Sequence, residues 1–234
     1  MKKVFIIGNW KSYKTSLETT MWFQEISNLL AGRQVSNFEN KEVVLCVPFT
    51  LLSLAKSLIE QYTLPITLGV QDISPFGEGK YTGEINGKQI AEFAKYVIIG
   101  HSERRKYFDE NEEIINQKIE QAVANKLTPI VCISELAQVD TLRVMSPSAP
   151  GNDGIIIAYE PLFAIGSGTP DTPENADSVA SDIAKKIENT PVIYGGSVTS
   201  QNAHSFTNMP SISGILPGGA SLDAQEFAAI VTNA

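Results

Sequence analysis

Apolar positions along the chain form short runs that alternate with stretches of helical periodicity. Eight runs are short and rich in β-branched residues, as buried parallel strands are; they cover residues 4–8, 43–47, 66–70, 96–99, 129–133, 155–158, 191–194 and 214–216. Helical patterns follow most of them, at about 16–30, 50–61, 112–125, 174–188, 201–206 and 223–231, with Thr50 as the expected cap of the second. This alternation, without a linker, predicts an α/β protein whose residues 1–234 form a single (β/α)8 barrel domain.

An open, doubly wound sheet is the competing architecture. It is weakened because no Gly-x-Gly-x-x-Gly turn follows the first run. The chain also contains no internal repeat and no low-complexity tract. We therefore expect the closed barrel.

The amino-acid composition argues against membranes and nucleic acid as binding partners and bears on the cell compartment. The hydrophobic fraction of 43% and the charged fraction of 19% fit a globular protein, and no apolar run reaches the roughly 18 residues of a membrane helix. A net charge of −8 argues against nucleic acid or an anionic membrane as partner. Cys46 and Cys132 both lie inside apolar runs, which predicts buried free thiols and favours the cytoplasm.

The most informative polar residue is Glu160, which follows the sixth run. Ligands of parallel α/β folds bind where the strands end. A carboxylate at the mouth of an apolar core is desolvated, which suits a general base. The segment behind it ends in Gly166-Ser167-Gly168 and suits a lid. The alternative is a structural glutamate paired with a lysine.

Two other strand ends carry polar side chains. Asn9 and Lys11 follow the first run and face the same side by strand alternation. His101, one of only two histidines, follows the fourth run, and Ser102 can begin a helical turn there. The positive end of such a turn favours the neutral imidazole. A solvated charge cluster with a capping serine is the alternative.

Diglycines follow the seventh and eighth runs, as Gly195-Gly196 and Gly218-Gly219. The loops at these two positions of a barrel often hold a phosphate, and glycine permits close approach of the backbone. Two diglycines in adjacent loops indicate a phosphorylated ligand.

Taken together and in this order, the motifs identify a family. The chain resembles the triosephosphate isomerases along nearly its whole length, as a shortened member. The matching motifs are Asn9-Trp10-Lys11, Thr82-Gly83-Glu84, Gly100-His101-Ser102-Glu103-Arg104-Arg105, Tyr159-Glu160-Pro161 with Ala164-Ile165-Gly166, Tyr194-Gly195-Gly196-Ser197-Val198 and Gly218-Gly219-Ala220-Ser221.

The resemblance implies the chemistry of proton transfer through an enediol. Glu160 would remove the proton beside the carbonyl of dihydroxyacetone phosphate, and neutral His101 would polarise that carbonyl; a glutamate base with a neutral histidine is the established pairing of this family. Lys11 would stabilise the developing negative charge, and Asn9 would help to position the oxygens. The product would be D-glyceraldehyde 3-phosphate, as in glycolysis and gluconeogenesis.

The resemblance also implies the supporting groups and the partner. Glu103, with Ser102 beside it, would support the Lys11 region, and residues 161–169 would close as a lid that excludes water. No metal and no organic cofactor are implied. Thr82 would contact a second subunit in a homodimer. The phosphate would be held by the backbone at Gly166, Ser197, Gly218 and Gly219.

The chain departs from the family at several points. Only 20 residues, Glu135 to Gly154, connect the fifth and sixth runs, where the family usually has a long helix. A short helix over 136–145 would leave the barrel surface thinly covered, so a higher homo-oligomer or a tighter dimer is expected to hide it. Phe163 replaces the usual Trp, and Thr169-Pro170-Asp171 replaces Lys-Thr-Ala, so that Pro170 stiffens the lid hinge. Pro217 removes a backbone donor beside the phosphate site, and Ser134 stands where Gly is usual.

Two further functions compete. Another phosphate-binding barrel enzyme, such as a metal-dependent epimerase or a Schiff-base aldolase, is weakened because only His101 and His204 offer imidazole ligands and the strand ends offer only Lys11. A catalytically impaired phosphate-binding barrel, acting as a binding or assembly protein, would explain the shortened crossover. It would not explain why the proposed catalytic residues and the lid occur together.

Overall fold

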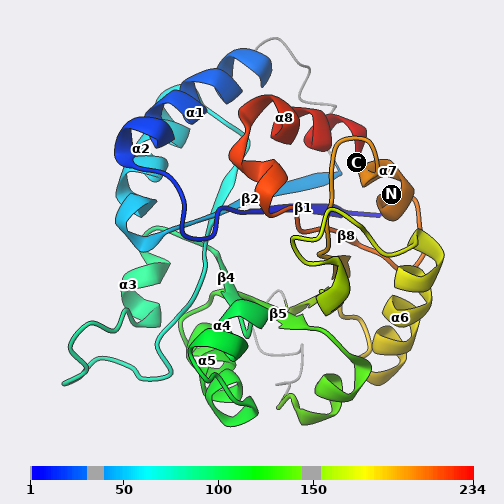
Figure 1. Cartoon of the computed structure of the whole chain (residues 1–234). Helices are drawn as coiled ribbons and strands as arrows, with labels where there is room; N and C mark the ends of the chain where they lie inside the picture. The colour runs from blue at the N-terminus through cyan, green and yellow to red at the C-terminus, as the bar shows by residue number, and fades with distance from the viewer. Residues whose placement is uncertain (1, 31–39, 144–153) are drawn as a thin grey trace.

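The computed structural model describes residues 2–30, 40–143 and 154–234 and shows a closed parallel barrel (Figure 1). Each strand pairs with the next, and β8 pairs with β1 to complete the ring. The predicted (β/α)8 fold is confirmed, with every strand within two residues of its expected bounds. The strands are β1 Val4–Asn9, β2 Lys41–Val47, β3 Thr67–Val70, β4 Tyr96–Ile99, β5 Thr128–Ile133, β6 Ile156–Tyr159, β7 Val192–Tyr194 and β8 Gly214–Ile215.

Helices surround the barrel and connect its strands. None of those in the described ranges has the length and apolar character needed to span a membrane. The α-helices are α1 Ser16–Leu30, α2 Leu52–Tyr62, α3 Gly87–Ala91, α4 Ser102–Tyr107, α5 Glu112–Ala124, α6 Pro173–Lys186, α7 Ala203–Thr207 and α8 Ala224–Asn233. Short 3₁₀ helices are η2 Phe49–Leu51, η3 Leu136–Thr141, η4 Leu162–Ala164 and η5 Gly219–Leu222.

The expected cap of α2 is wrong. Thr50 lies inside η2, and η2 runs directly into α2, which begins without a hydrogen bond from a capping side chain. The preceding 3₁₀ turn takes the place of the cap because its last residue, Leu51, already lies in the helical region of the backbone angles.

Two apolar cores hold the barrel together. One lies between the strands and the surrounding helices. The other fills the barrel interior with twelve buried side chains, including Cys46 and Cys132. Both cysteines are free, as predicted, and burial raises the pKa of each thiol.

The shortened crossover after β5 is tied to α5. The described part of the helix expected over 136–145 is the 3₁₀ helix η3, and position 145 lies outside the described residues. Asn116 of α5 donates from Nδ2 to the carbonyl of Thr141 (2.9 Å) and accepts at Oδ1 from the N–H of Arg143 (2.5 Å). One buried amide therefore holds both sides of the turn that ends η3.

The barrel wall beside this crossover is covered. Val131 and Ile157, which point outward from β5 and β6 into the outer core, are completely buried, and Val139 of η3 packs in the same cluster. The expectation of a thinly covered wall is therefore wrong. Val139 of η3, with the partly buried Leu136 and Leu142 beside it, belongs to the core that covers these strands.

Candidate active site

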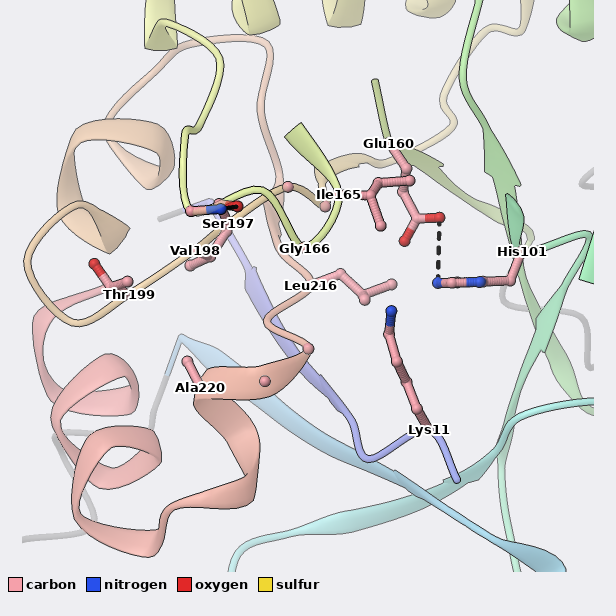
Figure 2. A pocket seen from close by; sticks show the side chains of 15 residues that line it. Lys11, His101, Glu160, Ile165, Gly166, Ser197, Val198, Thr199, Leu216 and Ala220 are labelled. Carbon is pink, nitrogen blue, oxygen red and sulfur yellow. Dashed lines mark hydrogen bonds and ion pairs between the residues drawn. The ribbon is translucent and has the colours of Figure 1, made fainter. Parts of the chain in front are cut away.

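A cavity of about 260 Å³ opens at the carboxyl ends of the strands, where barrel enzymes bind their ligands (Figure 2). Most of the predicted site residues line it: Lys11, His101, Glu160, Gly166, Ser197, Gly218 and Gly219. Asn9, Ser102, Glu103 and Thr82 lie outside its lining. The topology thus brings together residues from five separate loops.

Lys11 reaches into the cavity from the end of β1. Its backbone has a positive φ of 51°, a conformation that is costly for a residue with a side chain. Buried Asn9 stabilises this turn, because its Oδ1 accepts a hydrogen bond of 3.0 Å from the N–H of Lys11. The Lys11 ammonium forms an ion pair with the carboxylate of Glu103.

His101 follows β4, and a hydrogen bond from the backbone indicates the tautomer of its ring. Nδ1 accepts from the backbone N–H of Glu103 (3.2 Å), which makes His101 the cap of α4. A nitrogen that accepts carries no proton, so the neutral ring has its hydrogen on Nε2. Ser102 begins α4 as predicted, but the alternative in which this serine is the cap is wrong.

Glu160 faces His101 across the cavity (Figure 2). Its Oε2 lies 3.7 Å from Nε2 of His101. The residue is only 3% exposed, and Oε2 has no hydrogen-bond partner among the described residues. No lysine in the described ranges pairs with it, which counts against a structural glutamate. A buried carboxylate oxygen without a donor is suited to accept a proton.

Gly195 provides the space that the Glu160 side chain occupies. A Cβ atom at this position would lie 2.8 Å from Cγ and 3.0 Å from Oε1 of Glu160. The diglycine after β7 was predicted from its phosphate-binding role, and this second role was missed. One feature of the sequence could have indicated it. Tyr159 and Tyr194 end adjacent strands and are paired in the register, so Glu160 and Gly195, which follow them, are neighbours.

The other end of the cavity is lined by backbone. Gly218 and Gly219 precede and begin η5, and a Cβ at Gly219 would meet nothing within 4 Å. Open space beside the main chain lets an anion approach N–H groups closely. Lys11 adds a positive charge beside Gly218, its Cε lying 3.5 Å from the position that a Cβ of Gly218 would take. Pro217 contributes its carbonyl, which accepts from the N–H of Asn9 (3.0 Å).

Ser197 holds the predicted lid against the cavity. Its hydroxyl donates to the carbonyl of Ala164 (2.7 Å) and accepts from the N–H of Gly168 (3.2 Å). Between these points the lid turns through Gly166 and Gly168, both with positive φ. The side chains of Leu162 and Phe163 are 67% and 60% exposed, so the lid's outer face is in contact with solvent.

Apolar lining residues escaped prediction. Ile165, Val198, Leu216 and Ala220 shape the cavity, yet nothing in their type or spacing separates them from ordinary core residues. A second cavity of about 730 Å³ adjoins the first across Ile165 and is lined by Ser102 and Glu103. It is larger but contains neither the buried carboxylate nor the glycine backbone. Among the described residues no cluster of His, Cys, Asp and Glu could hold a metal ion.

A buried carboxylate facing an imidazole, beside a glycine-lined cavity end on a parallel barrel, is the arrangement expected of a (β/α)8 enzyme that moves protons on a small anionic ligand. A family model described as triosephosphate isomerase matches residues 4–234. The chain belongs to the triosephosphate isomerase family, and the resemblance drawn from its motifs is confirmed.

Individual relatives agree with the family match. The chain is 40% identical to the triosephosphate isomerase of Picosynechococcus sp. over 245 residues, which cover 99% of each chain. It is 36% identical to that of a Synechococcus strain over 244 residues, which cover 99% of this chain and 97% of the relative. It is 34% identical to that of Thermus thermophilus over 254 residues, which cover 99% and 98%.

Proposed function

We propose that the chain is a triosephosphate isomerase that interconverts dihydroxyacetone phosphate and D-glyceraldehyde 3-phosphate. Membership of the family supports an isomerase acting on a phosphorylated triose. The observation that carries the proposal is the buried Oε2 of Glu160, which has no hydrogen-bond partner among the described residues and lies 3.7 Å from Nε2 of the His101 imidazole.

In the proposed reaction Glu160 is the base and His101 the electrophile. Glu160 removes a proton from the carbon beside the carbonyl, and the electrons of that C–H bond form the carbon–carbon double bond of an enediolate. The Nε2–H of His101 donates to the carbonyl oxygen as its charge develops, and then relays the proton between the two oxygens. Glu160 returns its proton to the neighbouring carbon, which completes the isomerisation without any net change in protons.

Four further residues supply charge or position the groups of the site. Lys11 balances the enediolate, and Asn9 acts on it through the turn that aims the lysine rather than from the cavity wall. Glu103 performs two tasks: its carboxylate pairs with Lys11, and its N–H fixes the tautomer of His101. Ser102 supports the site by opening α4, where these contacts are made.

The substrate phosphate lies in the glycine-lined end of the cavity. Backbone groups of Gly166, Ser197, Gly218 and Gly219 surround it, with no metal or organic cofactor needed for the proposed steps. The lid then covers the enediolate, which otherwise loses its phosphate group by elimination when water has access.

We also propose a homodimer in which the loop between β3 and α3 contacts the second subunit near Thr82. This loop projects from the barrel (Figure 1). It carries two exposed aromatic residues, Phe76 and Tyr81, whose rings stack with centroids 4.3 Å apart. Exposed rings on a projecting loop suit a subunit contact. A monomer in a sedimentation measurement at micromolar concentration would contradict this proposal. An assembly larger than a dimer would instead support the higher homo-oligomer expected from the sequence.

Two broader expectations remain proposals. The ring of eight strands, to which segments from the whole length of the chain contribute, supports a single domain over residues 1–234. The two free, buried thiols support a cytoplasmic location, where cysteines stay reduced.

The test is a coupled assay of the purified protein for interconversion of the two triose phosphates. Glu160→Asp withdraws the carboxylate by one methylene, so turnover should collapse by at least about 10²-fold. Glu174→Asp, in the exposed first turn of α6, is the matched control and should leave turnover unchanged. A folded protein without turnover would favour the impaired phosphate-binding barrel that acts as a binding or assembly protein.

A further inference from the structure

The chain between the lid and α6 has an unusual composition. It reads Thr169-Pro170-Asp171-Thr172-Pro173, with a proline on each side of an aspartate. Each proline fixes its own φ near −65°. Exposure changes abruptly here: residues 166–169 are exposed, whereas Asp171 is only 9% exposed. Asp171 is therefore a buried carboxylic acid at the hinge of an otherwise exposed lid.

The Asp171 carboxylate is bonded to the first turn of α6. Oδ1 accepts from the N–H of Thr172 (2.8 Å), and Oδ2 accepts from Nδ2 of Asn175 (2.7 Å). Thr172 in turn caps the helix, since its hydroxyl accepts from the N–H of Asn175 (3.2 Å). These bonds join the last hinge residue to a 14-residue helix.

The backbone of Asp171 is bonded to the barrel. Its N–H donates to the hydroxyl of Tyr194 at the end of β7 (2.8 Å). Burial, with the nearby negative charge of Asp171 adding to it, raises the pKa of both Tyr159 and Tyr194. The two phenols therefore stay neutral, and the Tyr194 oxygen remains an ordinary acceptor for the Asp171 N–H. The Tyr194 ring lies beside that of Tyr159, with centroids 6.5 Å apart, and Tyr159 immediately precedes Glu160.

From these contacts we infer that Asp171 is a positioning residue for the lid: its carboxylate holds the hinge on α6, so that the lid returns in register onto Ser197. The inference rests on the proposed isomerase function. Only two residues separate Asp171 from Gly168, whose N–H must meet the Ser197 hydroxyl. Without the carboxylate, Asp171 loses its link to the helix, and the closed lid is reached less often.

Loss of the Asp171 carboxylate should change how the enediolate intermediate divides between product and a side reaction. A lid that closes less often exposes the enediolate to water, and elimination of phosphate then competes with return of the proton. A residue that merely stabilised α6 would lower the melting temperature without changing this partition. The fraction of turnovers that release inorganic phosphate therefore separates the two roles.

The experiment compares Asp171→Ala and Asp171→Asn with the control Glu174→Ala, which removes an exposed carboxylate from the same helical turn. Asp171→Ala removes both hydrogen bonds of the carboxylate. We expect kcat/KM to fall at least about tenfold, the loss typical of one hydrogen bond to a charged group, and phosphate release per turnover to rise. Asp171→Asn keeps an acceptor for the Thr172 N–H and should lose less. Unchanged phosphate release and kcat/KM in Asp171→Ala, with only a lower melting temperature, would overturn the inference.

A second measurement works even if the wild-type chain does not isomerise triose phosphates, an outcome that would defeat the proposed function alone. Phe163→Trp places a fluorescent reporter on the exposed face of the lid. Titration with inorganic phosphate should change its fluorescence, and adding Asp171→Ala should weaken the apparent affinity for phosphate. Identical titration curves with and without Asp171 would show that the carboxylate does not act on the lid.

Discussion

The substitution Gly195→Ala tests whether the proposed base needs the space that this glycine leaves. The added Cβ would lie 2.8 Å from Cγ and 3.0 Å from Oε1 of Glu160. Glu160 is buried, so its side chain cannot swing freely into solvent. The methyl group must therefore displace the carboxylate within the cavity, or push β7 away from β6.

The size of the effect follows from this contact. Carbon atoms pack best at about 3.5–4.0 Å, so Cγ must move by roughly 0.7 Å or more. A misplacement of about 1 Å at a reacting group costs on the order of 10²-fold in rate, or about 2.7 kcal/mol. Stability should fall by less than the roughly 1–3 kcal/mol of ordinary overpacking, because the atoms that move belong to the end of a side chain. KM should change little, since the glycine-lined end of the cavity is untouched.

The assay is steady-state kinetics together with thermal unfolding. Gly77→Ala is the matched control, because a Cβ there would meet only Oε1 of Gln121, at 3.7 Å. We expect kcat to fall about 100-fold in Gly195→Ala and to be unchanged in the control. Combined with Glu160→Asp, whose carboxylate is already withdrawn, the two losses should be less than additive. A kcat within about threefold of wild type would refute the reasoning, because the base would then tolerate the methyl group.

Two further predictions concern stability. Lys118 is buried, and its ammonium pairs with Asp72 and Glu110, so Lys118→Met should lower the free energy of unfolding in urea by about 3–5 kcal/mol. The control Lys185→Met, which breaks an exposed ion pair, should lower it by less than about 1 kcal/mol. Equal losses in the two variants would contradict this prediction. Burial raises the pKa of Tyr194 to about 12, above the value of about 10 in the unfolded chain, so its contribution is present below pH 10 and lost as the pH rises to 12. Between pH 10 and 12 the free energy of unfolding of Tyr194→Phe should therefore fall by less than that of the wild type. Equal falls in the two proteins would contradict this prediction.

The barrel could be predicted because its strands are buried on both faces and their sequences are continuous apolar runs. Elements that local contacts define were less visible. The helix α3 has only five residues, too few for a helical period, and depends on a capping box between Asn86 and Gln89. At the crossover after β5, Val139 and the partly buried Leu136 and Leu142 join the outer core from a turn without periodicity.

At the site, residue type and position at a strand end identified the chemistry, but not the packing around it. Glu160 and His101 stand where polar residues are conspicuous against apolar strands. The space left by Gly195 depends on a distance between neighbouring strands, which no pattern along one strand encodes. Stiffening of the hinge by Pro170 stays a prediction, and the bonds that hold Asp171 appear only when α6 and β7 are placed beside it.

The enclosed thiols make this protein a convenient subject for chemical labelling. Cys46 and Cys132 are the chain's two cysteines; both lie inside the barrel, and burial keeps them in the protonated, unreactive form. A cysteine introduced at exposed Leu162 would be the single accessible thiol on the chain. A dye or spin label could then be attached to the lid itself without first removing any native residue, and the opening and closing of the enzyme could be timed directly.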